Sequence, residues 1–229
     1  MPLKWGLRLA IEGDLRYLSH RDCARLVERA AARARLPLKY TQGFNPHPVL
    51  ALICPRPVGV ASRDDLVVLS LTEPVEPEDL LARMGRQTPP GMRFCRAEPL
   101  AGKKAPQVRR VHCELPVRPD RREALAPRAD EFRAAAAWPL ERHRPGREAR
   151  PVRLDLKQLV EHLELDAGRL QWTLIPAGNV WARPAEVLEA LGLDGQLDLA
   201  AVERTRIEYD FGSPAPPPQG PAAVTRTIS

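Results

Sequence analysis

The residues best suited to chemistry lie between Leu18 and Pro48, in the stretch LSHRDCARLVERAAARARLPLKYTQGFNPHP. Its arginines recur at every fourth position, at Arg21, Arg25, Arg29 and Arg33. At about 3.6 residues per turn, this spacing places them on one slowly drifting stripe of a helix. Like charges at this spacing repel each other, and only Glu28 offers local relief. The stripe therefore predicts phosphate contacts, and the alternative is a solvated face or ion pairs with acids elsewhere in the fold.

The same stretch ends in the loop QGFNPHP, residues 42–48, which presents an aromatic ring, an amide and an imidazole. Prolines on both sides of the imidazole restrict its backbone, and the glycine provides conformational freedom. The ring could stack on a base, the amide could read a base edge, and the imidazole could contact phosphate or transfer a proton. The alternatives are a core position for the ring, a turn for the amide and a structural hydrogen bond for the imidazole. The candidate binding residues of this loop are Gln42, Gly43, Phe44, Asn45 and His47.

A second histidine, His20, follows Ser19 at the expected start of the helix. With His47 and Tyr40, it completes the candidate groups for metal-free acid–base chemistry on RNA. The spacing does not show whether the two histidines meet, and a structural role for each is the alternative.

These side chains need a scaffold, and the pattern of the first hundred residues predicts one. Ser19, with Asp22 three residues later, predicts the capped start of a helix that ends near Arg35, before Pro37. Apolar alternation predicts strands over 4–11, 48–54, 65–72 and 92–97, and a second helix is expected over 78–86. The order strand, helix, strand, strand, helix, strand is that of a ferredoxin-like βαββαβ unit.

The second half repeats this order without sequence identity. Strands are expected over 108–117, 138–143, 170–176 and 203–210, and helices over 120–136 and 183–191. In an insertion over 144–166, the run LDLKQLVEHLEL fits either a strand end or a short helix. The sequence thus predicts an α+β protein of two tandem ferredoxin-like units with antiparallel sheets. The expected divisions are a first domain over 1–98, a linker over 99–107, a second domain over 108–211 and a disordered tail over 212–229.

Composition limits the classes of protein. The net charge is +6, and most of the 35 basic residues are arginine, which suits phosphate and carboxylate partners. Apolar runs do not exceed six residues, so we expect no membrane span, no signal peptide and a cytoplasmic location. The cysteines are scattered and we expect them to be free, buried thiols rather than metal ligands: Cys23, Cys54, Cys95 and Cys113.

The stretch from Ser19 to Pro48 resembles the signature of the radical SAM-linked protein family, a bacterial domain of unknown function. The family pattern SH-D-R-ERA-R-LP-Y-QGFNPHP is matched at Ser19, His20, Asp22, Arg25, Glu28, Arg29, Ala30, Arg33, Leu36, Pro37, Tyr40, Gln42, Gly43, Phe44, Asn45, Pro46, His47 and Pro48. Cys23 and Thr41 depart from it, where an aliphatic residue and Ser are usual. Weaker agreement at 52, 57–59, 183–187 and 204–205 adds Arg183 to the candidate binding residues.

The resemblance implies a partner rather than a reaction: a radical SAM protein with a cobalamin-binding-like domain. This chain has no CxxxCxxC run, no GxGxxG and no P-loop, so we expect no cofactor in it. The iron–sulfur cluster and S-adenosylmethionine are expected in the partner only.

Three functions follow as hypotheses. The first is a non-catalytic accessory module that handles the substrate of the radical SAM enzyme and binds RNA, either tRNA or rRNA. The second is a metal-free RNA-processing or RNA-modifying enzyme. The third is a protein-interaction scaffold that binds no nucleic acid.

Overall fold

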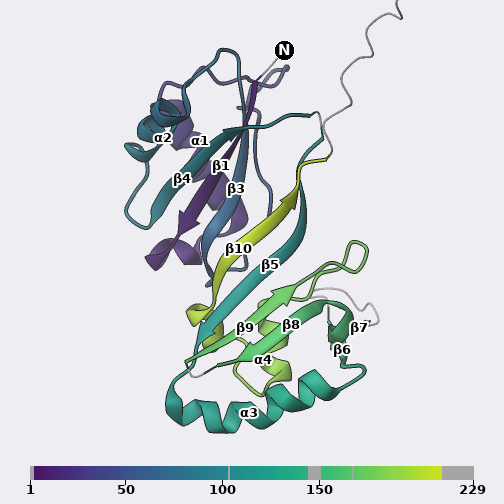
Figure 1. The fold of residues 1–229 in the computed structure, drawn as a ribbon. Coiled ribbons are helices and arrows are strands. Elements are labelled where there is room, and N and C mark those ends of the chain that lie inside the picture. The colour runs from purple at the N-terminus through teal and green to yellow at the C-terminus, as the bar shows by residue number, and fades with distance from the viewer. Residues whose placement is uncertain (1–2, 103, 144–150, 167, 213–229) are drawn as a thin grey trace, which may run out of the picture.

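The computed structural model of this chain describes residues 3–102, 104–143, 151–166 and 168–212. These residues form a mixed α+β fold with four α-helices and one large, mostly antiparallel sheet (Figure 1). The expected α+β class is confirmed. The expected tail over 212–229 lies, apart from Gly212, outside the described residues.

The first half supplies one end of the sheet and two helices. Its elements are β1 (Leu3–Ile11), α1 (His20–Arg33), β2 (Leu50–Leu52), β3 (Ala61–Leu71), α2 (Pro77–Gly85) and β4 (Met92–Pro99). The strand order is β4-β1-β3, with β2 on the far side of β3, and each of these pairs is antiparallel. All six elements were expected, but β2 is shorter than the expected 48–54, which begins at a proline that cannot donate to a ladder.

The second half supplies the other end of the sheet. Its elements are β5 (Gln107–Pro116), α3 (Pro119–Ala134), β6 (Pro139–Arg142), β7 (Val152–Asp155), β8 (Val160–Leu165), β9 (Arg169–Leu174), α4 (Pro184–Ala190) and β10 (Glu203–Asp210). Its strand order is β10-β5-β9-β8, again antiparallel throughout. Three short 3₁₀ turns, η1 (Gly13–Tyr17), η2 (Leu156–Gln158) and η3 (Asp198–Ala201), complete the described secondary structure.

One expected strand has a different role from the one predicted. The strand expected over 138–143 is β6, which pairs with β7 in a separate two-stranded sheet rather than in the large one. The edge strand is instead β8, from the LDLKQLVEHLEL run that was left open between strand and helix. Val160 and Leu163 of β8 are buried against the core, whereas Pro139 and Glu141 of β6 are exposed. The segment whose apolar side chains are buried in the core therefore joins the large sheet, and the more exposed one does not.

The two halves share one sheet. Strand β10 runs parallel to β3 and pairs with it at only two positions, Glu203 with Ala61 and Arg204 with Ser62. The sequence predicts two antiparallel sheets, and this short parallel junction merges them into one. The junction also explains why β3 begins at Ala61 and not at 65, since its polar first residues face β10.

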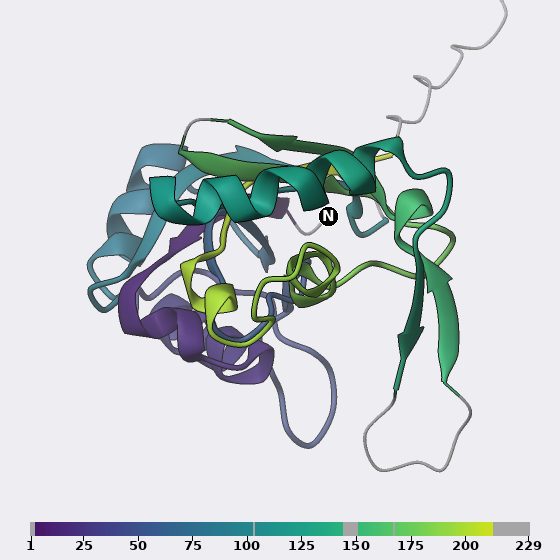
Figure 2. The same ribbon diagram turned by 90° about the horizontal axis from the view of Figure 1, so that it is seen from below.

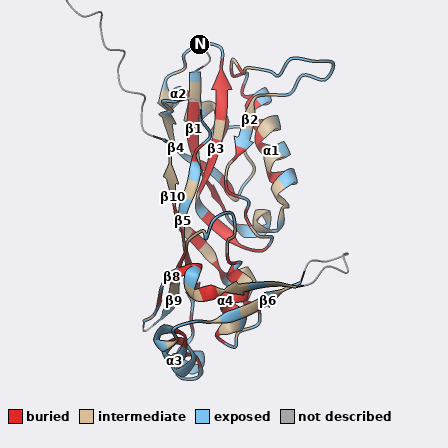
Figure 3. Cartoon of the chain, turned by 90° about the vertical axis from the view of Figure 1, so that its right-hand side faces the viewer, coloured by how far each residue is buried: buried red, intermediate tan, exposed pale blue. Residues whose placement is uncertain are grey.

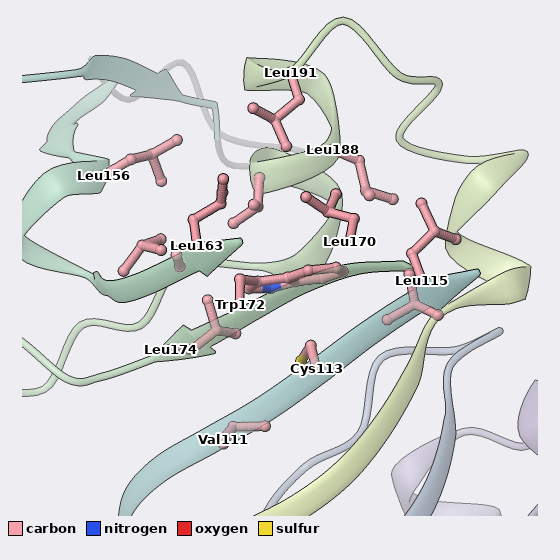
Figure 4. Close-up of a cluster of buried hydrophobic side chains, with 14 of the residues drawn as sticks. Val111, Cys113, Leu115, Leu156, Leu163, Leu170, Trp172, Leu174, Leu188 and Leu191 are labelled. Atoms are coloured by element: carbon pink, nitrogen blue, oxygen red, sulfur yellow. The ribbon is translucent and has the colours of Figure 1, made fainter. Parts of the chain in front are cut away.

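Each half has its own hydrophobic core on the helix side of the sheet. In the first half, Leu7 and Leu9 of β1 pack with Cys23 and Val27 of α1 and with Leu80 of α2. The second core contains Trp172 of β9 among the residues shown in Figure 4: Val111, Cys113, Leu115, Leu156, Leu163, Leu170, Leu174, Leu188 and Leu191. All four cysteines are free as expected, but Cys95 is exposed and corrects the expectation that it is buried.

The opposite face of the sheet, which we call the charged face, carries ion pairs. Arg110 on β5 binds Glu161 at 2.6 and 2.8 Å, and it also reaches Glu208 on β10 at 3.3 Å. His112 contacts the same Glu208 at 3.0 Å. These side chains on the charged face thus connect β5 with β10 and, across β9, with β8.

Candidate nucleic-acid interface

Helix α1 begins where the sequence predicts. The Ser19 hydroxyl oxygen accepts the backbone N–H of Asp22 at 3.2 Å, and the hydroxyl donates to the Asp22 carboxylate at 2.7 Å. This cap satisfies one of the free N–H groups of the first turn. The helix then buries one face, through Cys23, Val27 and Ala30. Its opposite face is left to solvent.

The exposed face of α1 carries the four arginines, which we call the arginine stripe: Arg21, Arg25, Arg29 and Arg33. All four are exposed, and Figure 3 shows exposed positions along the outer side of this helix. Arg25 lies 3.7 Å from Asp22 in a solvent-exposed pair, which holds it weakly. The other three have no ion pair or side-chain hydrogen bond with any residue that the structure describes. Ion pairing within the fold, one of the alternatives for this stripe, is thereby excluded for those three across the described residues.

The loop after α1 is closed at its base and open at its tip. The Thr41 N–H donates to the His47 carbonyl at 2.8 Å, and the His47 N–H donates to the Thr41 hydroxyl at 3.0 Å. Next to this pair, on the side away from the tip, Tyr40 and Pro48 form a β-bridge. Gly43 has φ +136°, a conformation that favours glycine. The backbone is therefore held at both ends while residues 42–46 are exposed.

Phe44 lies at the tip of this loop and is fully exposed to solvent. The alternative of a core position for this ring is wrong. An aromatic ring held fully in solvent on a closed loop loses the burial that usually stabilises Phe. Phe44 is the most exposed of the large hydrophobic residues among those that the structure describes.

The candidate acid–base residues do not form one site. His20 is the first residue of α1, and its Nδ1 is buried without a hydrogen-bond partner in the described part of the chain. His47 and Tyr40 lie on the loop beyond the other end of the helix. A helix of 14 residues is about 21 Å long. The structure thus separates His20 from His47 by the length of α1 and does not bring the pair together.

A buried charged network, which sequence reasoning missed, lies where the halves meet. Asp65 of β3 is fully buried and accepts hydrogen bonds from Arg204 at 2.5 Å and from the Ser62 hydroxyl at 2.7 Å. Arg56 is also buried, with its Nε 3.7 Å from Asp65. Two guanidinium groups thus share one carboxylate. The sequence signal was the polar run SRDD at the start of an otherwise apolar strand.

This network surrounds thiols that burial keeps protonated. Burial raises the pKa of Cys23 to about 11, although Arg56 opposes the shift. The Cys54 thiol accepts a hydrogen bond from Arg204 at 3.1 Å, yet burial raises its pKa as well. Neither sulfur is therefore a ready thiolate at neutral pH.

Arg183 lies apart from the arginine stripe, at the start of α4. Here it lines a cleft between the two halves, together with Arg109, Arg142 and Arg204. Figure 2 shows the 42–48 loop and the β6–β7 hairpin as two projections, with α4 lying between α1 and the hairpin. Figure 3 shows both projections on the same side of the sheet, one towards each end. The candidate binding residues therefore divide into two places, the α1 stripe with its loop and the cleft.

The described residues limit other kinds of site. No helix among them is long and apolar enough to cross a membrane. They hold no group of three or more His, Cys, Asp or Glu side chains that could bind a metal ion.

The fold and this surface define a mixed α+β protein with an exposed basic helix and an exposed aromatic loop. The chain belongs to a bacterial family described as uncharacterized protein conserved in bacteria (DUF2344), whose sequence profile matches residues 5–184. No curated protein matches the chain. The family covers the α1 stripe, the 42–48 loop and the cleft residue Arg183.

Proposed function

We propose that this protein binds RNA, either tRNA or rRNA, through the arginine stripe of α1 and the 42–48 loop. The proposal rests on the full exposure of Phe44. This ring lies on the loop after a helix whose arginines Arg21, Arg29 and Arg33 have no partner among the described residues. Guanidinium groups bind phosphate oxygens, and an exposed ring stacks on an unpaired base. Together they fit a single-stranded or loop region of RNA.

We further propose that each half is a ferredoxin-like unit. In each half the fourth strand lies beside the first, the third follows, and the second is outermost: β4-β1-β3-β2 and β10-β5-β9-β8. All the pairs within these two sets are antiparallel. Sheets of this kind support RNA binding in other proteins, which is an argument by analogy of fold.

In this proposal the protein is a cytoplasmic, non-catalytic accessory of a radical SAM enzyme. This part rests on the resemblance of the Ser19–Pro48 motif to the radical SAM-linked family. The partner would supply the iron–sulfur cluster and S-adenosylmethionine, and this chain would hold the RNA substrate. Co-expression with a radical SAM protein encoded beside it, followed by purification of a complex, tests the association.

The RNA surface is tested by fluorescence anisotropy with labelled tRNA and a labelled single-stranded RNA over a range of salt concentrations. The double variant Arg25→Ala/Arg29→Ala should bind RNA more weakly. Its log–log salt slope should be lower by about 1 for each lost phosphate contact. The matched control is Arg86→Ala, which removes an exposed arginine after α2. Equal affinity and slope in all three proteins would show that the stripe is only a solvated surface.

A further inference from the structure

The cleft between the two halves has the dimensions of a small-molecule site. Its volume is about 990 Å³, near the upper end of the usual range for ligand pockets. It is lined by the segment after the 42–48 loop, by the start of β5 and by the chain from β9 to α4. Because residues far apart in sequence form it, the cleft exists only when both halves are folded together.

The charged side chains among the described residues that line this cleft are all basic. Four arginines line it, and no Asp or Glu is found among the described residues of its wall. Three of the four have carboxylate partners behind the wall: Arg109 binds Asp210, Arg142 binds Glu186 and Arg204 binds Asp65. Arg183 has no side-chain partner in the described part of the chain. The cleft therefore offers one free guanidinium group to an anion.

The backbone that carries this free group is fixed. The Glu186 carboxylate accepts the Arg183 N–H at 2.7 Å and binds the Arg142 guanidinium at 2.6 and 2.7 Å. Arg142 also donates to the Trp181 carbonyl at 2.7 Å. Glu186 and Arg142 are largely buried, so this arrangement ties β6, Trp181 and the start of α4 together. Its effect is to fix the backbone of Arg183 while the side chain stays exposed, so that binding has to order only this side chain.

The inner wall is charged as well. Arg204 is only 2% exposed, and its Nε has no hydrogen-bond partner among the described residues. It shares the single carboxylate of Asp65 with Arg56, so the buried network retains an excess positive charge. Arg204 also donates to the backbone carbonyls of Pro55 and Cys54, at 3.2 and 3.3 Å, and an anion in the cleft would add a second counter-charge beside Asp65.

The rest of the wall suits a planar organic group such as a nucleobase. The lining includes Ile53, Val108 and Trp181, which are apolar or aromatic, and Gln107 and Asn179, which carry amide side chains. Apolar surface and an indole ring accommodate a base, amides can hydrogen-bond its edge, and guanidinium groups bind its phosphate.

We propose that this cleft binds a nucleotide unit, with the phosphate at Arg183 and the base against the wall formed by Ile53, Val108 and Trp181. The unit is either a free nucleoside monophosphate or an unpaired nucleotide of a bound RNA. In the second case the inference rests on the RNA binding proposed above, and in the first it is independent of it.

The test uses the full chain and two probes. Calorimetric titration with adenosine and uridine 5′-monophosphates measures the free nucleotide, and anisotropy with a labelled four-nucleotide RNA measures the RNA-held unit. At least one probe should bind, and Arg183→Ala should weaken that binding about 10- to 100-fold, as expected for a charge-assisted hydrogen bond. Ile53→Trp, which fills the cleft, should weaken it in the same way, while Arg86→Ala should not.

The two probes also show whether the nucleotide is free or part of an RNA, and they distinguish the cleft proposal from the proposal of RNA binding by the arginine stripe. Binding of the monophosphates identifies a free nucleotide, and binding of the short RNA alone identifies an RNA-held unit. The Arg25→Ala/Arg29→Ala protein should retain its affinity for the monophosphates, because the arginine stripe is not part of the cleft. Failure of both probes to bind, or binding unchanged in both Arg183→Ala and Ile53→Trp proteins of normal melting temperature, would overturn the inference.

Discussion

The large sheet and helix α1 are both rich in arginine, but they use it in opposite ways. In the four central strands, arginines on both faces of the sheet bind carboxylates, as Arg8 binds Asp64 at 3.0 Å and Arg204 binds Asp65 at 2.5 Å. On α1, Arg25 has one long exposed contact, and the other three arginines have no partner in the described residues. The number of arginines is therefore a poor guide to binding, and their pairing is a better one. A paired guanidinium is already committed to the fold, whereas an unpaired one is available to a ligand.

The largest effect should come from the buried, paired arginines of the sheet. Asp65→Ala leaves Arg56 and Arg204 buried without their shared carboxylate, and we expect a loss of about 3–5 kcal/mol in the free energy of unfolding. Urea denaturation measures it. The control is Asp130→Ala, which removes an exposed partner of Arg133 on α3 and should cost under about 1 kcal/mol. A similar small loss in both variants would mean that the sheet does not depend on its buried pairs.

The second effect concerns binding rather than stability. Phe44→Ala should weaken RNA binding by about 1–3 kcal/mol, the usual value for one base stacked on an aromatic ring. The melting temperature should stay the same, because the ring makes no buried contact. Leu197→Ala, which removes an exposed apolar side chain in the second half, serves as the control in the same anisotropy measurement. A drop in melting temperature with unchanged RNA affinity would assign Phe44 to the fold.

A smaller change is expected from a paired residue of the charged face. The Asp64 carboxylate accepts Arg8 at 3.0 Å and the Ile207 N–H at 2.7 Å, so it connects β3 with both β1 and β10. Because both side chains keep some contact with solvent, at 18% and 21% exposed, Asp64→Ala should cost about 1 kcal/mol of stability. RNA affinity should not change. Weaker RNA binding by this variant, at a temperature where it is fully folded, would contradict the division between paired and unpaired arginines.

The smallest effect should be a pH dependence of stability that comes from the same face. The hydrogen bond with His112, followed by that with Arg110, lowers the pKa of Glu208, and the hydrogen bond with Arg110 lowers the pKa of Glu161. A lowered folded pKa favours the native state above the unfolded value of 4.5, and this contribution is lost as the pH falls below it. Melting temperatures measured from about pH 6 to pH 3 should therefore fall less steeply in Arg110→Gln than in the parent protein. Equal slopes would mean that Arg110 does not lower the pKa of either carboxylate in the folded chain.

Local signals in the sequence were sufficient for the helices and most strands. Ser19 and Asp22 fixed the start of α1, and the apolar alternation of β1 and β10 gave their bounds to within one residue. The arginine stripe followed from the same helical period. These features depend on neighbours within one or two turns of chain, which a single sequence displays directly.

The pairing of strands that are far apart in the sequence could not be predicted from local signals. Nothing near Ala61 or Arg204 in the sequence indicates that β3 and β10 lie side by side, because their contact spans 139 residues at the Asp65–Arg204 pair. The position of Phe44 was likewise ambiguous, since hydrophobic character alone favours burial and only the closed loop shows that the ring is exposed. The cleft was missed for the same reason, as its walls come from separate regions of the chain.

The parallel junction between β3 and β10 sets an order for events during synthesis. The first half leaves the ribosome complete in its own strands, but Asp65 then has only the more distant Arg56 as a cationic partner. Arg204 arrives with the last described strand, which pairs with both β3 and β5 in the folded protein. Until then the second half lacks its strand beside β5, and the cleft lacks its inner wall. The newly made chain therefore completes the cleft and the Asp65–Arg204 ion pair only when β10 joins the sheet, so that a protein truncated before β10 loses both together.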